Sequence, residues 1–134
     1  MIAVDTHIIR GLIDRDPAVL RWISTLAERP RVPAMVSAEV RYGLERLPNG
    51  RRRDALAQRV DVALAHLGVP LAFDGAAASA YGALVARRDR AGHPISVQDA
   101  IIAATCLVRG AALATRNTKA FAGLGLDLID PWHA

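Results

Sequence analysis

Three isolated carboxylates carry the chemistry that the sequence of this 134-residue chain suggests. Asp5 ends an apolar run, whereas Glu39 and Asp99 each stand where a helix is expected to begin. In a parallel sheet covered by helices, the strand ends and the following helix starts meet at one edge, so the three acids are expected to converge there. Carboxylates that share a pocket repel one another unless a proton or a hard cation intervenes. The pattern therefore predicts a site for Mg²⁺ or Mn²⁺.

Each of these acids also has a purely structural explanation. Asp5 can cap the helix that follows it, because aspartate accepts hydrogen bonds from free backbone N–H groups. Glu39 is expected in the first turn of a helix capped by Ser37, where the helix dipole favours negative charge. Asp99 follows Ser96 at the spacing of a capping box. Taken singly these explanations are sufficient, so the functional interpretation depends on the convergence of the three side chains.

Short apolar runs alternate with helical patterns along the chain, which predicts the elements that must position the acids. Strands are expected at 1–4, 31–36, 69–73, 111–115 and 126–130. Helices are expected at 8–13, 17–29, 37–47, 51–66, 75–90 and 96–109, with Asp16 and Asp74 as caps and Gly110 at the end of the last helix. Strands separated by helices indicate an α/β fold with a mostly parallel sheet of about five strands flanked by helices. Residues 1–134 are expected to form a single domain.

The composition of the chain limits the cellular compartment and the binding partners that we expect. The single cysteine, Cys106, rules out an intramolecular disulfide, and together with a start that does not resemble a leader peptide it favours the cytoplasm. No uncharged run approaches the roughly 20 residues that a membrane span needs. The cysteine has no CxxC partner and the histidines are scattered, so zinc is not expected. The net charge of +4, carried almost entirely by arginine, suits a polyanion such as RNA, although a coding bias toward arginine explains the same composition.

Four stretches of the chain, taken in order, resemble one known family. They are IAVDTHII (2–9), VSAEVRYGLERLPNGRRRDAL (36–56), HPISVQDAIIAATCLVRGAALATRNTKAFAGL (93–124) and LIDPW (128–132). This combination is similar to PIN-domain ribonucleases, the VapC-type toxins of bacterial type II toxin–antitoxin pairs. The resemblance implies a three-layer PIN-like fold and a Mg²⁺- or Mn²⁺-dependent endoribonuclease that hydrolyses RNA phosphodiester bonds. It also implies that Asp5, Glu39 and Asp99 are catalytic and hold the metal ion.

The chain departs from the family pattern after the strand expected at 111–115. An acidic or polar group is usual there, and this chain has Asn117, while Ala120 stands where many relatives carry an acid. Asn117 is therefore the fourth candidate catalytic residue, able to orient a metal-bound water through its amide, or else it is an ordinary turn residue. The missing carboxylate leaves open an alternative function, a catalytically weak or inactive PIN-like protein that binds RNA or acts as a scaffold. The opening Asp5-Thr6-His7 also differs from the common Asp-Thr-Asn.

Cations near the predicted site are candidates for contacts with RNA phosphates. Arg116 and Lys119 lie in the loop after the strand at 111–115, and Arg10 lies about one helical turn beyond Asp5. The run at 51–53 is more conspicuous but is expected to be a solvated helix start. Thr115, at the end of its strand, is expected to be an ordinary strand-end hydroxyl rather than a group that holds water or phosphate.

The resemblance also implies protein partners. Toxins of this kind form homodimers and are blocked by a small cognate antitoxin that lies over the acidic site. An apolar groove between the helices expected at 17–29 and 37–47 is the predicted docking place, lined by Trp22, Met35 and Tyr42. A phosphoacceptor domain would also gather acids around Mg²⁺, but it would need adjacent acids after the first strand, and the chain has no such pair.

Overall fold

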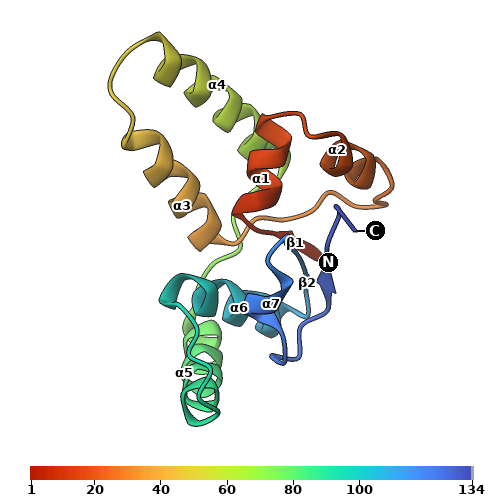
Figure 1. Cartoon of the computed structure of the whole chain (residues 1–134), viewed down its shortest axis with the longest axis vertical. Coiled ribbons are helices and arrows are strands. Elements are labelled where there is room, and N and C mark those ends of the chain that lie inside the picture. Colours follow the sequence, from red (N-terminus) through yellow and green to blue (C-terminus); the bar gives the residue numbers. More distant parts are fainter. Residues whose placement is uncertain (134) are drawn as a thin grey trace.

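A short parallel sheet lies at the centre of the computed structural model, which describes residues 1–133 (Figure 1). Its strands are β1 (Ile2–Val4), β2 (Ala112–Ala114) and β3 (Leu128–Ile129), ordered β1-β2-β3 and all parallel. Val4 pairs with Ala114 in the register of β1 and β2, so the residues that follow these two strands emerge side by side. The predicted α/β architecture with a parallel sheet is confirmed.

Two further segments extend the sheet beyond β1 without forming strands. Arg31 makes a parallel bridge with Ala3, and Pro33 makes one with Leu71. The order across the molecule is therefore the Leu71 segment, residues 31–33, β1, β2 and β3. All five predicted strand segments lie in this parallel arrangement, but the expected strands at 31–36 and 69–73 are reduced to isolated bridges. Pro33 has no N–H to donate to a ladder, and a helix starts immediately after it.

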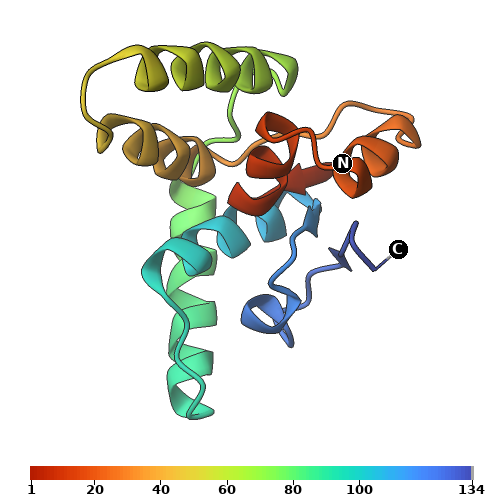
Figure 2. The ribbon, with the colours of Figure 1, turned by 45° about the horizontal axis from the view of Figure 1, so that its top comes forward.

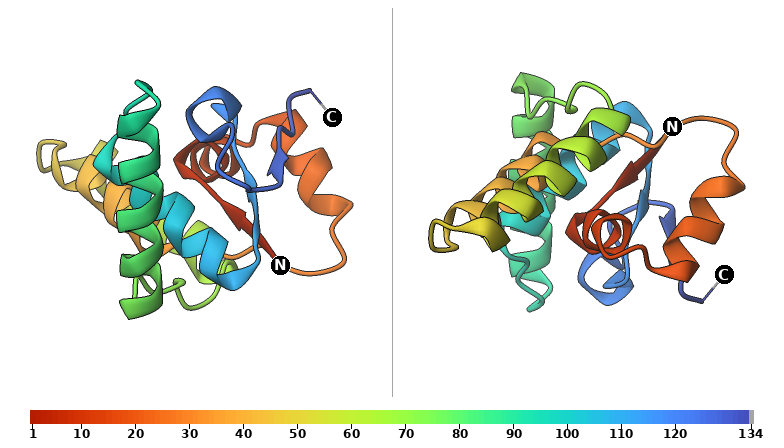
Figure 3. Two further views of the ribbon diagram at one scale, coloured as in Figure 1. Left: turned by 90° about the horizontal axis from the view of Figure 1, so that it is seen from below. Right: turned by 90° about the horizontal axis from the view of Figure 1, so that it is seen from above.

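Helices cover both sides of the sheet. They are α1 (Thr6–Ile13), α2 (Pro17–Ser24), α3 (Ala34–Glu45), α4 (Arg51–His66), α5 (Gly75–Arg90), α6 (Val97–Arg109) and the short α7 (Thr118–Phe121). Helices α3 to α6 lie on one side, and α2 lies on the other (Figure 3). The antiparallel pair α3 and α4 extends above the sheet, whereas α5 crosses α6 and projects below it (Figure 2). No helix among residues 1–133 is both long enough and apolar enough to cross a membrane.

Local signals for helix ends are confirmed at most positions. The side chains of Asp16, Asp74 and Ser96 accept hydrogen bonds from backbone N–H groups at the starts of α2, α5 and α6. Gly110 ends α6 with a φ of 62°, a left-handed conformation that glycine adopts without steric cost. The predicted helix at 17–29 is shorter than expected, since α2 ends at Ser24.

The predicted start of α3 is wrong. The helix begins at Ala34 directly after Pro33, and no side chain caps it. Ser37 lies inside the helix, and its Oγ atom is buried without a hydrogen-bond partner among the described residues. Glu39 is consequently beyond the first turn of α3, where the helix dipole has little effect. The structural explanation that the sequence offered for Glu39 does not apply.

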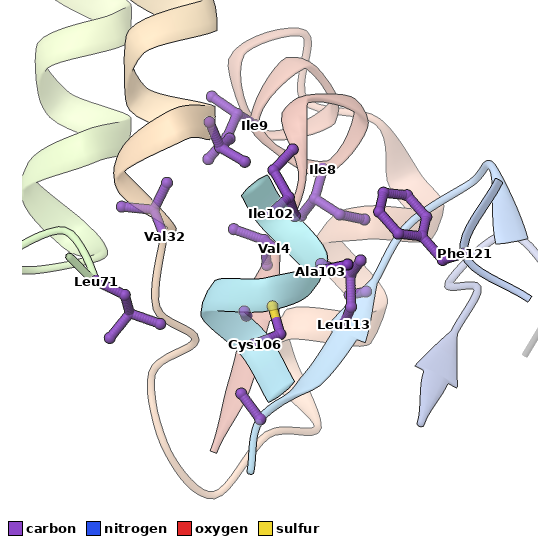
Figure 4. Close-up of a cluster of buried hydrophobic side chains, with 14 of the residues drawn as sticks. Val4, Ile8, Ile9, Val32, Leu71, Ile102, Ala103, Cys106, Leu113 and Phe121 are labelled. Atoms are coloured by element: carbon purple, nitrogen blue, oxygen red, sulfur yellow. The ribbon is translucent and has the colours of Figure 1, made fainter. Parts of the chain in front are cut away.

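The core fills the space between α1, α6 and the sheet. Ile8, Ile102 and Leu113 are almost completely buried there and are among the larger apolar side chains of the core (Figure 4). Burying a side chain of this size stabilises the fold by about 1.5–3 kcal/mol relative to leaving it exposed. The packing fixes the end of β1 against the start of α1, which is the point where the first candidate acid lies.

Candidate active site

Asp5 connects β1 to α1, and hydrogen bonds fix both its backbone and its side chain. Its N–H donates to the carbonyl of Ala114 over 3.1 Å, which continues the sheet pairing by one residue. Its Oδ1 atom accepts from the N–H groups of His7 and Ile8 at 2.9 and 3.3 Å. The capping role is therefore confirmed, yet it occupies only Oδ1. With 5% of its surface exposed, Asp5 is one of the few buried polar residues in the described chain.

The second oxygen of Asp5 faces the end of β2. Thr115, which is fully buried, donates its hydroxyl to Oδ2 of Asp5 and accepts the N–H of Asn117 at 3.0 Å. His7 places its Nδ1 atom 3.1 Å from the same Oδ2. Thr115 is therefore more than the ordinary strand-end hydroxyl that was expected. The pairing of Val4 with Ala114 places the residues after these strands side by side, so a predicted register would have revealed the contact.

Glu39 reaches the site from α3 and is half-buried. The hydroxyl of Thr6 donates to its Oε1 atom in a long hydrogen bond of 3.5 Å. Burial raises the pKa of Glu39, and the nearby negative charges of Asp99 and Asp5 raise that pKa further. Two carboxylates that are far away in sequence therefore lie close enough to Glu39 to act on its charge.

Asp99 stands in the first turn of α6. Its backbone N–H donates to the Oγ atom of Ser96 over 3.1 Å, so one half of the expected capping box forms. Its carboxylate has no hydrogen-bond or ion-pair partner among residues 1–133. Capping therefore leaves both oxygens of Asp99 available.

The donor chemistry of these acids fits a hard divalent cation, because such ions prefer carboxylate oxygens. Burial and, after it, the negative charges of Asp99 and Asp5 raise the pKa of Glu39, and a bound cation would relieve the repulsion between these acids. As the side chains lie, however, residues 1–133 contain no group of three acidic, histidine or cysteine side chains close enough to hold one ion. The three-carboxylate metal site stays a prediction, and it requires the side chains to draw together around an ion.

The remaining predicted site residues occupy different surroundings. Asn117 is exposed at the start of α7 and caps nothing with its side chain. Arg10 and Lys119 are both exposed. Arg116 lies with its guanidinium 4.8 Å from the ring centroid of Trp132, a stacked arrangement that holds the cation against the C-terminal segment. Their assignment to RNA phosphates stays a prediction, with Arg116 the most restrained of the three.

Glu39 borders a cleft of about 380 Å³ between α1, α3 and α4. Thr6 lies beside it, and Arg10, Arg52 and Arg59 also line the cleft. Glu39 thus faces a cleft whose other charged residues are mostly basic, an arrangement that attracts a polyanion.

A larger cavity of about 670 Å³ replaces the groove that was predicted for a protein partner. It lies between α1, α2 and α4 rather than between α2 and α3, and Leu12, Leu20, Ile23 and Val62 provide apolar surface.

None of the predicted lining residues contributes to this cavity. Trp22 belongs to the core and Met35 packs against it, while Tyr42 is 65% exposed and carries the guanidinium of Arg46 over its ring.

The family model described as the PIN domain matches residues 2–125 of the chain. The chain is 39% identical over 138 aligned positions to "VapC ribonuclease Y4jK" from Sinorhizobium fredii, covering 99% of both chains. It is 30% identical to "Toxin FitB" from Neisseria gonorrhoeae, again with 99% of each covered.

Solved structures share the fold. The crystal structure of FitAcB from Neisseria gonorrhoeae superposes with a TM-score of 0.88 at 30% identity, covering 100% of both chains. A toxin–antitoxin complex from Klebsiella pneumoniae gives a TM-score of 0.76 at 23% identity over 98% of each chain, a likeness of fold alone.

Proposed function

Because the chain belongs to the PIN-domain family, we propose that it is a VapC-type toxin that hydrolyses RNA phosphodiester bonds with a divalent metal ion. The observation that carries the proposal is the position of Glu39, which is half-buried and near enough to Asp99 and Asp5 that their charges add to the effect of burial in raising its pKa. The names of the relatives, a VapC ribonuclease and a toxin, support the same function.

Asp5, Glu39 and Asp99 are the residues that would hold Mg²⁺ or Mn²⁺. When bound, such an ion supplies charge stabilisation and lowers the pKa of a coordinated water, which is the nucleophile that phosphodiester hydrolysis needs. The absence of an acid at position 117 reduces the negative charge of the site, so a second ion would be held more weakly.

Besides holding the ion, Asp5 and Glu39 each have a further task in this proposal, and two cations have a task of their own. Asp5 is rigid because its two oxygens are fixed by the start of α1 and by Thr115, so it supplies a preorganised anchor. Glu39 binds a proton more readily than an exposed glutamate, and its Oε1 atom can take a proton from an attacking water. Arg10, on the cleft that Glu39 borders, and the exposed Lys119 contact phosphates of the RNA chain.

The second candidate function is an RNA-binding or scaffold protein that cleaves weakly or not at all. Two observations favour it: Asn117 stands where an acid is common, and the three carboxylates do not lie close enough to form a ready-made ligand set among the described residues. The basic cleft would serve binding as well as cleavage.

Hydrolysis of single-stranded RNA separates the two functions. The nuclease is expected to cleave with Mg²⁺ or Mn²⁺, to stop when a chelator is added, and to lose at least about a hundredfold in rate in Asp5→Asn. The exposed Asp61→Asn is the matched control, because Asp61 pairs only with Arg41 among residues 1–133, on the surface. RNA that is bound by the parent protein but stays intact with both metals would identify the binding protein instead.

A cognate antitoxin is the second proposed partner. The cavity between α1, α2 and α4 offers apolar surface with Arg15, Arg29 and Arg59 among its lining residues, which suits an amphipathic segment carrying acidic groups. Co-expression with the protein encoded beside it and co-purification test this partner, and Leu20→Asp is expected to abolish capture.

A homodimer is also proposed, in line with the resemblance to VapC-type toxins. Light scattering on the purified chain across a concentration series gives its mass in solution directly. A mass that stays at one chain throughout that series would end this part of the proposal.

A further inference from the structure

A third cavity, of about 740 Å³, lies between the end of α5, the turn at 91–94 and the segment 117–123. Arg87, Arg88, His93 and Lys119 line it, and its other lining residues are all uncharged. No carboxylate borders the cavity among the described residues, so its charged lining is entirely basic.

The walls of this cavity are tied together by Arg88. Its Nη2 atom donates to the carbonyls of Ala120 and Ala122 at 2.8 and 3.0 Å, and its Nη1 atom donates to the carbonyl of His93 at 3.3 Å. One guanidinium thus joins α5 to both neighbouring loops. Because three of its five N–H donors are bound to backbone carbonyls, Arg88 is held in place as part of the wall of the cavity.

Arg87 and Lys119 differ from Arg88 because their side chains make no such hydrogen bonds among residues 1–133. Among residues 1–133, neither side chain has an ion-pair or hydrogen-bond partner, whereas Arg41 and Arg53 on the opposite arm of the molecule pair with Asp61 and Glu45. The partial negative charge at the end of α5 opposes an anion here, but it amounts to about half an elementary charge and the basic last turn outweighs it.

Asn117 and the turn at 91–94 link the walls of this cavity to two of the candidate acids. Asn117 lines it, and the N–H of this residue donates to Thr115, whose hydroxyl in turn donates to Asp5. The turn at 91–94 leads directly into the start of α6, which carries Asp99. The segments that carry Asn117 and Asp99 therefore also border the cavity that Arg87 and Lys119 line.

We propose that this cavity is a phosphate subsite, which holds the RNA backbone on one side of the bond that is cleaved. The inference rests on the proposed function, because it takes RNA as the substrate. Arginine and lysine that carry no carboxylate partner can bind phosphate without first breaking an ion pair, and contacts of this kind are insensitive to base sequence. The subsite therefore contributes affinity for long substrates rather than recognition of a particular base.

Salt-dependent binding of fluorescein-labelled single-stranded RNA to the Asp5→Asn protein tests the subsite without cleavage. Each lost phosphate contact on a single strand lowers the slope of log affinity against log salt by about 0.7. Arg87→Ala is expected to reduce that slope by about this amount and to weaken binding about fivefold at low salt, and Arg87→Glu is expected to do more. The matched control is Arg90→Ala, since Arg90 is exposed on the same helix but does not line the cavity.

Unchanged slopes in both Arg87 variants would overturn the subsite. If the parent protein cleaves RNA while these slopes stay unchanged, the proposed function stands and the subsite fails. If the slopes fall as expected but the parent never cleaves RNA, the subsite stands and the nuclease fails. A further outcome contradicts the inference. If Arg87→Glu weakens the binding of an acidic peptide but not the binding of RNA, the cavity belongs to a protein partner.

Discussion

The hydroxyl of Thr115 donates a hydrogen bond to Oδ2 of Asp5 across a separation of 110 residues. The contact exists because β1 and β2 are parallel and end at the same level, with Val4 opposite Ala114. It joins the first acid of the site to the loop that carries Asn117. The relationship therefore makes the end of β2 a structural support for the acid at the end of β1.

Replacement of Thr115 by valine tests this support. Valine keeps the volume but leaves an oxygen of Asp5 and the N–H of Asn117 without this partner, at a cost of about 1–3 kcal/mol in the free energy of unfolding. RNA cleavage is expected to fall roughly 10- to 100-fold, as for other residues that orient metal ligands. Thr115→Ser retains the hydroxyl and is expected to cleave within a few-fold of the parent. Equal loss in both variants would show that the methyl group, and not the hydrogen bond, matters.

Glu39→Gln is expected to stabilise the metal-free protein at neutral pH. The raised pKa means that folded Glu39 binds its proton more tightly than unfolded Glu39, so stability falls as pH rises from the ordinary value of 4.5 through the folded pKa. Glutamine removes this loss and can still accept the hydrogen bond of Thr6. Thermal unfolding with a chelator should therefore give Glu39→Gln a higher Tm than the parent at pH 7 and no advantage near pH 4.

Two observations complete the Glu39 experiment. Addition of Mg²⁺ is expected to raise the Tm of the parent more than that of Glu39→Gln, since a bound cation stabilises only the folded state. The exposed Glu28→Gln serves as the control and should behave like the parent. An equal Tm for parent and Glu39→Gln at pH 7 would argue against repulsion between the acids.

A substitution at Gly11 tests the packing of α1 against α2, which helps to position α1 beside the site. A Cβ atom at this position would lie 2.5 Å from Cγ2 of Val19, so α1 and α2 approach closely only because residue 11 has no side chain. Gly11→Ala is expected to lower the free energy of unfolding by about 1–3 kcal/mol. Gly82→Ala, in open space on α5, should instead gain up to about 1 kcal/mol from helix propensity. The Gly11→Ala/Val19→Ala pair should lose less stability than the sum of the two single variants.

Much of the fold was predictable because its signals are local. Asp16, Asp74 and Ser96 stand next to the N–H groups that they cap, and Gly110 follows the helix that it ends, so a short stretch of sequence is sufficient in each case. Ser37 misled the prediction because a serine is a common cap, whereas α3 starts at Ala34, directly after Pro33. Proline already has the φ that a helix start accepts and has no N–H to satisfy.

The candidate site was predictable in its residue types but not in its closest contacts. The acids could be placed at one edge from topology alone, and the raised pKa of Glu39 agrees with that placement. The bond from Thr115 to Asp5 depends on strand register, and the cavity between α1, α2 and α4 depends on how helices distant in sequence pack. The hydrophobic periodicity of a single segment predicts neither the register of two strands nor the packing of distant helices.

Binding of Mn²⁺, followed by electron paramagnetic resonance, tests most directly whether the three acids share one cation. The parent is expected to bind the ion, and Asp5→Asn, Glu39→Gln and Asp99→Asn are each expected to weaken its affinity at least about tenfold. Glu28→Gln should leave the affinity unchanged. Parental affinity in all three site variants would contradict the account, because the acids would then be separate helix-start and surface residues rather than one metal site.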